Sequence, residues 1–206
     1  MNTLEVEVKH IINNFDDLYK YARKQFICYE KLEGIDNWKE YGFSIDCSDD
    51  QMRFKDMLQI RCIEELTEAT HALDNIDHFY EEVTDALNFF LSAYCMLDVD
   101  FKQFTNPQKI FNQTNYRISI YSGVGVIGTY FYKIIDDIGD LCNLLKNRPW
   151  AQSNYLVSML DFNERLKKLW NTFWTVLAIL GLKPEQIFEL FERKYLVNKW
   201  RISTKY

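Results

Sequence analysis

The sequence predicts an all-α fold, a bundle of helices, and three observations lead to this prediction. Its 206 residues include only seven Gly and three Pro, too few for the frequent turns of a β fold. Apolar side chains recur every three to four positions over long stretches, as they do on one face of a helix. Hydrophobic residues make up 48% of the chain, which is enough to bury a large core. We expect one compact unit, with an N-terminal part (residues 1–53) and a helical domain (residues 54–206).

The N-terminal part is predicted to hold one helix, from about residue 8 to residue 32, and Gly34 marks its end. The aromatic side chains of this helix are expected in the core. After an irregular segment, Ser48 and Gln51 have the spacing of a capping box, in which each side chain bonds the other residue's backbone N–H. This pair predicts the start of the next helix.

Two acidic pairs are the most informative feature of the helical domain. Glu65 and Glu68 lie three positions apart in one predicted helix, and Glu82 and Asp85 do so in the next. Each pair alone would be ordinary solvated surface, but the short polar segment 74–77 favours an antiparallel hairpin that brings the four carboxylates together. Like charges held so close repel, so the site needs cations. Oxygen ligands without His or Cys favour Mg²⁺ over zinc.

The second half of the helical domain is similar to the first. IDDIGDLCNLL at 135–145 aligns with IEELTEATHAL at 63–73, and further matches follow in the same order. This self-similarity predicts two tandem, diverged helical-hairpin repeats, at about 54–121 and 126–206.

The two predicted repeats differ in their charges. In the second repeat, Arg165 and Lys168 stand where the first repeat has its second acidic pair. Asp137 and Asp140 would therefore face cations that belong to the protein itself. We expect no second metal site there.

Composition excludes several other classes of protein. The net charge of −6 argues against binding to duplex nucleic acid, which needs clustered Lys and Arg. No apolar run is long enough to span a membrane. The five cysteines form no CxxC pair, and the odd count without a signal peptide indicates a reducing, cytoplasmic setting.

The acidic residues also form a known pattern, EExxE followed by ExxD. Glu64, Glu65 and Glu68 match its first half, and Glu82 and Asp85 match its second. The chain thus resembles the all-α nucleoside triphosphate pyrophosphohydrolases, which include MazG-like enzymes, the dimeric dUTPases and phage dCTP/dUTP pyrophosphatases. The resemblance implies that Mg²⁺ is held by Glu65, Glu68, Glu82 and Asp85. Glu64 and Glu65 are implied to orient or deprotonate the attacking water. It also implies hydrolysis of dUTP to dUMP and pyrophosphate, by attack of a metal-activated water at the α-phosphorus.

The resemblance extends to residues expected to contact the substrate. The last helix and the NRPW segment resemble triphosphate-binding parts of these enzymes, and the N-terminal helix supplies a Gln that reads uracil. The chain departs from the pattern at Asn88, where relatives usually have His, and at Tyr29, where they have Asn. The substrate-binding residues implied in this way are Gln25, Asn88, Arg148, Trp150, Lys194, Asn198, Arg201 and Tyr206.

The sequence leaves several alternatives open. The base could be that of dCTP, a modified pyrimidine or a purine instead of uracil. A non-catalytic nucleotide sensor or a helical interaction module would keep the same carboxylates. Relatives are commonly homodimers, although the internal duplication could satisfy the same surfaces within one chain. The resemblance to short phage proteins suggests a viral source, with action in the host cytoplasm.

Overall fold

The computed structural model describes residues 10–32, 42–145 and 157–204, and these residues form an all-α bundle without strands, as the sequence predicts. The longer helices are α1 (Phe15–Leu32), α5 (Ile76–Met96), α7 (Val124–Leu144), α8 (Met159–Ile179) and α9 (Pro184–Thr204). Shorter helices are α3 (Ser48–Lys55), α4 (Ile63–His71) and α6 (Pro107–Gln113), with 3-10 turns at Phe101–Gln103 and Ile120–Ser122. None of the described helices is long and apolar enough to cross a membrane.

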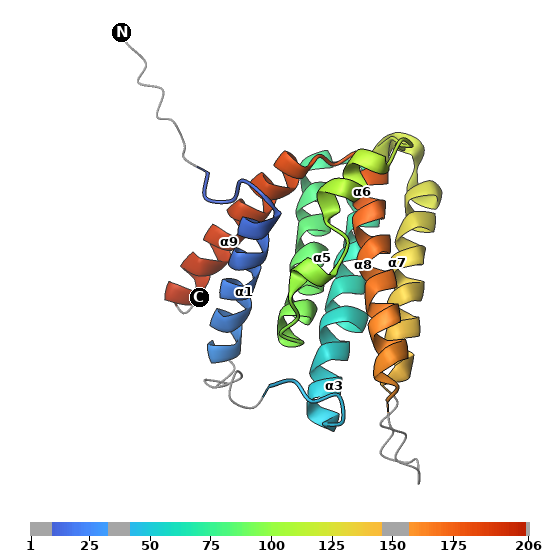
Figure 1. The fold of residues 1–206 in the computed structure, drawn as a ribbon. Coiled ribbons are helices and arrows are strands. Elements are labelled where there is room, and N and C mark those ends of the chain that lie inside the picture. The colour runs from blue at the N-terminus through green and yellow to red at the C-terminus, as the bar shows by residue number, and fades with distance from the viewer. Residues whose placement is uncertain (1–9, 33–41, 146–156, 205–206) are drawn as a thin grey trace.

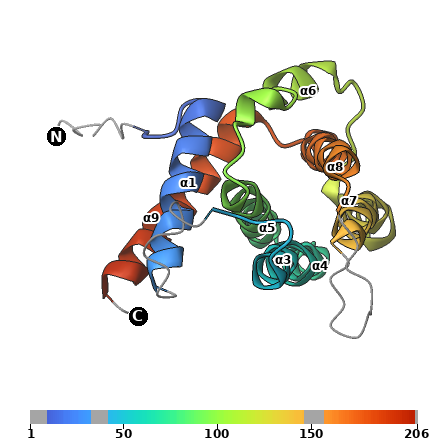
Figure 2. The same ribbon diagram turned by 60° about the horizontal axis from the view of Figure 1, so that its bottom comes forward.

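Helix α5 lies at the centre of the bundle (Figures 1 and 2). It packs against α4 on one side and against α1 and α9 on another, while α7 packs against α8 and α4. Fourteen of its residues, from Phe79 to Met96, are buried. Helix α5 contacts both α4, which carries the first acidic pair, and the C-terminal helix α9. Its side chains can therefore meet residues from distant parts of the chain.

An aromatic core joins α5 to α8. The ring of Phe90 stacks on Phe173 with centroids 4.0 Å apart, and the fully buried Trp170 lies 5.1 Å from Tyr94. The Tyr94 hydroxyl donates a hydrogen bond of 2.7 Å to the backbone carbonyl of Leu166. This hydrogen bond satisfies a polar group that burial would otherwise make costly.

One helical rod, residues 48–71, contains a wide π-helical turn between α3 and α4, at Asp56–Cys62. In a π-helix, residues five positions apart are neighbours. Arg61 accordingly donates from Nε to the Asp56 carboxylate, 2.8 Å away. The extra width also turns Ile60 outward, where 59% of it is exposed, although its sequence spacing placed it on the apolar face.

One predicted helix start is wrong, and the cap predicted for another is absent. Helix α1 begins at Phe15, after Asn14 accepts a hydrogen bond from the backbone N–H of Asp17 with its side chain, and residues 10–14 are not helical. Such a side-chain acceptor is a strong start signal, and it outweighs the helical spacing upstream. Helix α3 does begin at Ser48, as predicted, but no capping box forms, because Cys47 occupies the N-cap and makes no side-chain hydrogen bond there.

The two predicted hairpins are present as α4–α5 and α7–α8, each with its helices in contact. That these hairpins belong to two tandem repeats stays a prediction. Their origin by duplication is likewise a prediction.

Candidate metal and nucleotide site

Three carboxylates meet between α4 and α5. One oxygen from each of Glu65, Glu82 and Asp85 lies within 4.8 Å of the other two. The hairpin places them there, because Glu65 is on α4 and the other two are one turn apart on α5. Glu82 also contacts His78, whose Nε2 lies 2.6 Å from the Glu82 carboxylate.

Burial and mutual repulsion perturb this cluster. Burial raises the pKa of Glu65 to about 8, with further increases from its hydrogen bond to Glu82 and from the charge of Asp85. Burial also raises the pKa of Asp85, and the hydrogen bond from Lys194 opposes this effect. Carboxylates that are costly to ionise side by side are the expected environment for a cation.

Lys194 on α9 supplies one positive charge to the cluster. Its Nζ lies 2.5 Å from Oδ2 of Asp85, although the two residues are 109 positions apart. The other oxygen of Asp85, Oδ1, is buried and has no hydrogen-bond partner among the described residues. An unpartnered buried carboxylate oxygen, beside two more carboxylates, fits a hard divalent cation such as Mg²⁺, which prefers oxygen ligands.

The raised pKa of Glu65 predicts a pH effect on stability. Between the ordinary carboxyl value of 4.5 and about 8, the folded protein holds a proton on Glu65 that the unfolded chain has lost. Rising pH in this window therefore lowers the free energy of unfolding of the metal-free protein. Glu65→Gln cannot titrate, so its melting temperature in chelator should fall less than that of the wild type. If the melting temperatures of the two proteins fell equally as pH rises through this window, the raised pKa of Glu65 would be contradicted.

A second acidic cluster, between α7 and α8, is neutralised by the protein. Oxygens of Asp136, Asp137 and Asp140 lie within 4.8 Å of one another. Lys168 Nζ lies 2.6 Å from Asp137, and Arg165 lies 2.6 Å from Asp140. These pairings agree with the charges expected from the sequence.

Asp140→Asn should therefore leave nucleotide hydrolysis within about twofold of the wild type. The Asp140 carboxylate is 40% exposed, so loss of its ion pairs should cost about 1 kcal/mol or less. Steady-state rates and the melting temperature test this directly. An inactive but folded Asp140→Asn variant would assign a functional role to the second cluster.

A cavity of about 760 Å³ lies between the start of α5 and helix α9. Its walls include Arg193, Lys194 and Arg201 on α9, and His78 with the acidic Asp77 and Glu81 on α5. Because Lys194 also binds Asp85, this basic cavity adjoins the acidic cluster. We call it the basic cavity.

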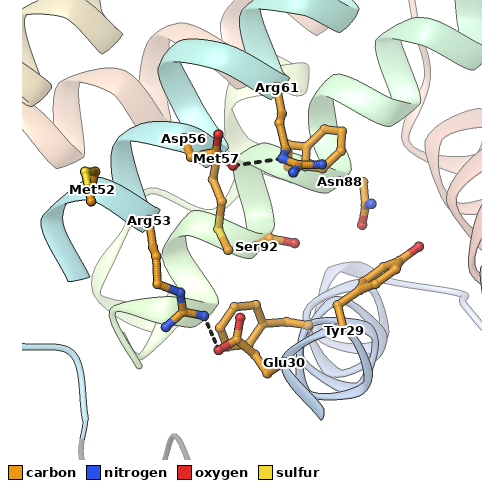
Figure 3. Close-up of a pocket in the computed structure, with 11 residues that line it drawn as sticks. Tyr29, Glu30, Met52, Arg53, Asp56, Met57, Arg61, Asn88 and Ser92 are labelled. Carbon is orange, nitrogen blue, oxygen red and sulfur yellow. Dashed lines mark hydrogen bonds and ion pairs between the residues drawn. The ribbon is translucent and has the colours of Figure 1, made fainter. Parts of the chain in front are cut away.

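A second cavity, of about 380 Å³, lies among α1, the rod and α5, and we call it the π-helix cavity (Figure 3). Arg61 lies at its wall with the guanidinium 5.7 Å from the centroid of the Phe89 ring, a cation–π contact. Arg53 forms an ion pair with the buried Glu30 on α1. Figure 3 places Asn88 and Tyr29 toward one side of this cavity and Arg53 toward the other.

The π-helix cavity also lies near the acidic cluster. Asn88 lines the π-helix cavity and lies one helical turn after Asp85. Tyr29 lines the same cavity, and its pKa is raised by burial, lowered by Arg201 and raised by Asp85. Tyr29 is therefore within electrostatic range of both the carboxylates and the basic cavity.

The remaining residues singled out from the sequence lie in different settings. Glu64 and Glu68 are exposed, and Glu68 lies outside the cluster of three, although its charge still raises the pKa of Glu65. Asn198 is buried on α9, and Gln25 is buried and donates a hydrogen bond to Asn88. Arg148, Trp150 and Tyr206 lie outside the described residues.

The sequence interpretation missed two residues that the structure brings to the site. His78 contacts Glu82 one turn away on α5, and this spacing was visible in the sequence. Arg61 lies in the π-helical turn and lines the π-helix cavity, and the spacing rules of an ordinary α-helix do not describe that turn.

Comparison with known proteins agrees with this geometry. The sequence model of a family described as dUTPase matches residues 68–206, which is more than half of the chain. The matched segment includes Glu82, Asp85 and all of α9, whereas Glu65 comes just before it. No curated protein and no solved structure matches the chain.

Proposed function

The chain belongs to the dUTPase family, whose members are all-α nucleoside triphosphate hydrolases, and from this premise we propose that it is a Mg²⁺-dependent deoxynucleoside triphosphate pyrophosphohydrolase. Its products would be the nucleoside monophosphate and pyrophosphate, with dUTP as the leading substrate. The observation that carries this proposal is the carboxylate cluster, which contacts Lys194 in the wall of the basic cavity and lies one helical turn from Asn88 in the wall of the π-helix cavity.

The basic cavity suits the triphosphate. Arg193, Lys194 and Arg201 project from one helix toward it and carry the charges that phosphate oxygens require. Anionic phosphates can approach the acidic cluster only with cations between them. Lys194 lies beside both the acidic cluster and the proposed triphosphate position, since it contacts Asp85 and lines the basic cavity.

Glu65, Glu82 and Asp85 would hold the metal, and Glu68, whose charge raises the pKa of Glu65, is proposed to join them. Bound Mg²⁺ there would supply a Lewis acid for phosphate oxygens and lower the pKa of a coordinated water. We propose that Glu65, which lies in the carboxylate cluster, also orients or deprotonates the attacking water. Lys194 and Arg201 would stabilise negative charge on the phosphate oxygens.

The π-helix cavity suits the nucleoside. The guanidinium of Arg61 lies against Phe89, which offers a flat surface for a base, and Asn88 offers a polar contact. Asn88 and Phe89 lie one helical turn after Asp85 on α5. A base in this cavity would therefore leave its phosphates beside the metal ligands.

A panel of nucleoside triphosphates, assayed with Mg²⁺ and with chelator, tests the proposal. We expect pyrophosphate release from dUTP with Mg²⁺, and none with chelator. Release of orthophosphate would contradict the proposed bond cleavage. Metal-dependent nucleotide binding without hydrolysis would instead identify a nucleotide sensor. The predicted homodimer is tested separately by the molar mass in solution.

A further inference from the structure

The two carboxylates that α5 supplies to the cluster each have one oxygen occupied by a nitrogen of the protein. Oδ2 of Asp85 lies 2.5 Å from Nζ of Lys194, and Oε1 of Glu82 lies 2.6 Å from Nε2 of His78. Both nitrogens belong to residues that line the basic cavity, one on α9 and the other in the first turn of α5. The two carboxylates are therefore held in the same way, by residues in the wall of one cavity.

This arrangement leaves one oxygen of each carboxylate for a metal ion. Oδ1 of Asp85 is buried and has no hydrogen-bond partner among the described residues. Glu82 also hydrogen-bonds Glu65, which is itself a proposed ligand, and a cation between these two carboxylates would replace that contact. His78 is not among the groups that meet in the cluster, so its contact with Glu82 can persist beside a bound ion.

The number of oxygens that each carboxylate presents decides which divalent cation it suits. Ca²⁺ is the larger ion and takes more oxygen ligands in a flexible geometry, often both oxygens of one carboxylate. Mg²⁺ is smaller, requires nearly ideal octahedral geometry, and keeps several waters beside a few carboxylate oxygens. A carboxylate whose second oxygen is held by a nitrogen presents a single oxygen to the ion. This restriction disfavours Ca²⁺.

We propose that His78 is a positioning residue that makes the cluster selective for Mg²⁺ over Ca²⁺, because it holds one oxygen of Glu82 away from the metal. Lys194 has the same effect on Asp85. This inference rests on the proposed function and deepens it, since it names the residues that select the metal. His78 acts on the ion only through Glu82, by fixing the orientation of that ligand.

The ratio of the dissociation constants for the two ions separates this effect from a simple change in charge. Mg²⁺ and Ca²⁺ carry equal charge, so a variant that only adds or removes charge near the cluster changes both affinities alike. A change in the oxygens available to the ion changes the two affinities differently. The ratio is measured by calorimetric titration of the nucleotide-free protein with MgCl₂ and with CaCl₂, and by the melting temperature in each salt.

Two variants of His78 test the proposal. His78→Leu removes the nitrogen at a position where the side chain is 54% exposed, so the fold is expected to persist. It should shift the ratio at least about tenfold toward Ca²⁺, the effect expected when the partner that orients a metal ligand is lost. His78→Gln keeps an N–H donor four positions before Glu82 and should stay within about threefold of the wild-type ratio.

Two further variants complete the comparison. Lys194→Met frees Oδ2 of Asp85 and should also shift the ratio toward Ca²⁺, while the loss of a positive charge strengthens the binding of both ions. His71→Leu is the matched control, because His71 is exposed on α4 and lines neither the basic cavity nor the π-helix cavity. It should leave the ratio within about twofold of the wild type.

The outcomes separate this inference from the proposed function. If no nucleoside triphosphate is hydrolysed, the proposed function fails, while the titrations of the nucleotide-free protein still test the metal selectivity. If the wild type binds Mg²⁺ and folded His78→Leu keeps the wild-type ratio, this inference alone is overturned. Tighter binding of Ca²⁺ than of Mg²⁺ by the wild type would also overturn it. Absence of Mg²⁺ binding in the wild type would overturn both.

Discussion

Asp85→Asn is expected to lower kcat/KM for the preferred triphosphate about 1000-fold while the helical circular dichroism stays unchanged. Within the described part of the chain, its carboxylate has one oxygen without a hydrogen-bond partner and another bound to Lys194, so in the proposed function it joins the metal ligands to the basic cavity. An amide keeps the shape but loses the charge that attracts a divalent cation. The melting temperature should also lose its increase with Mg²⁺, which is a measurement independent of turnover.

Two variants control this result. Glu82→Gln removes a second carboxylate of the cluster, whose partner is His78 and not Lys194, and should give a similar loss. Asp140→Asn makes the same chemical change in the neutralised cluster and should retain activity. If Asp85→Asn kept full activity and the full Mg²⁺ effect on melting, the carboxylate cluster would not be the metal site.

Lys194→Met is expected to have the second largest effect, in two separate measurements. In the metal-free protein, Asp85 loses the cation that pairs with it, so the free energy of unfolding should fall by about 2 kcal/mol. This is less than for a fully buried pair, because the two side chains are 19% and 13% exposed. The KM for the triphosphate should rise at least about tenfold, because charge-assisted contacts to phosphate are lost.

Added Mg²⁺ should raise the melting temperature of Lys194→Met more than that of the wild type. In the variant, a divalent ion meets a carboxylate that no lysine occupies. Lys199→Met is the matched control, since Lys199 is exposed on the same helix and is not among the residues lining the basic cavity. Equal Mg²⁺ effects in all three proteins would show that Lys194 and the metal do not share Asp85.

The sequence was most informative where local chemistry decides the structure. The spacing of apolar residues is enough to predict an all-α bundle, and the segment 74–77 is enough to predict the α4–α5 hairpin. The sequence predicts that Arg165 and Lys168 face Asp137 and Asp140, and ion pairs 2.6 Å long confirm it. Local rules failed at the start of α1, where a side-chain cap at Asn14 decides the boundary.

Residue types and spacing alone determined that this protein is helical, that acidic pairs occupy two neighbouring helices, and that its last helix is basic on one face. The tertiary structure decided which of these groups meet: Glu65 but not Glu68 joins the cluster, Lys194 reaches Asp85 across 109 positions, and Gln25 binds Asn88. The physical reason is that these contacts depend on how helices pack side by side, and on a π-helical turn that changes the direction of side chains. Neither is encoded in the periodicity of a single helix.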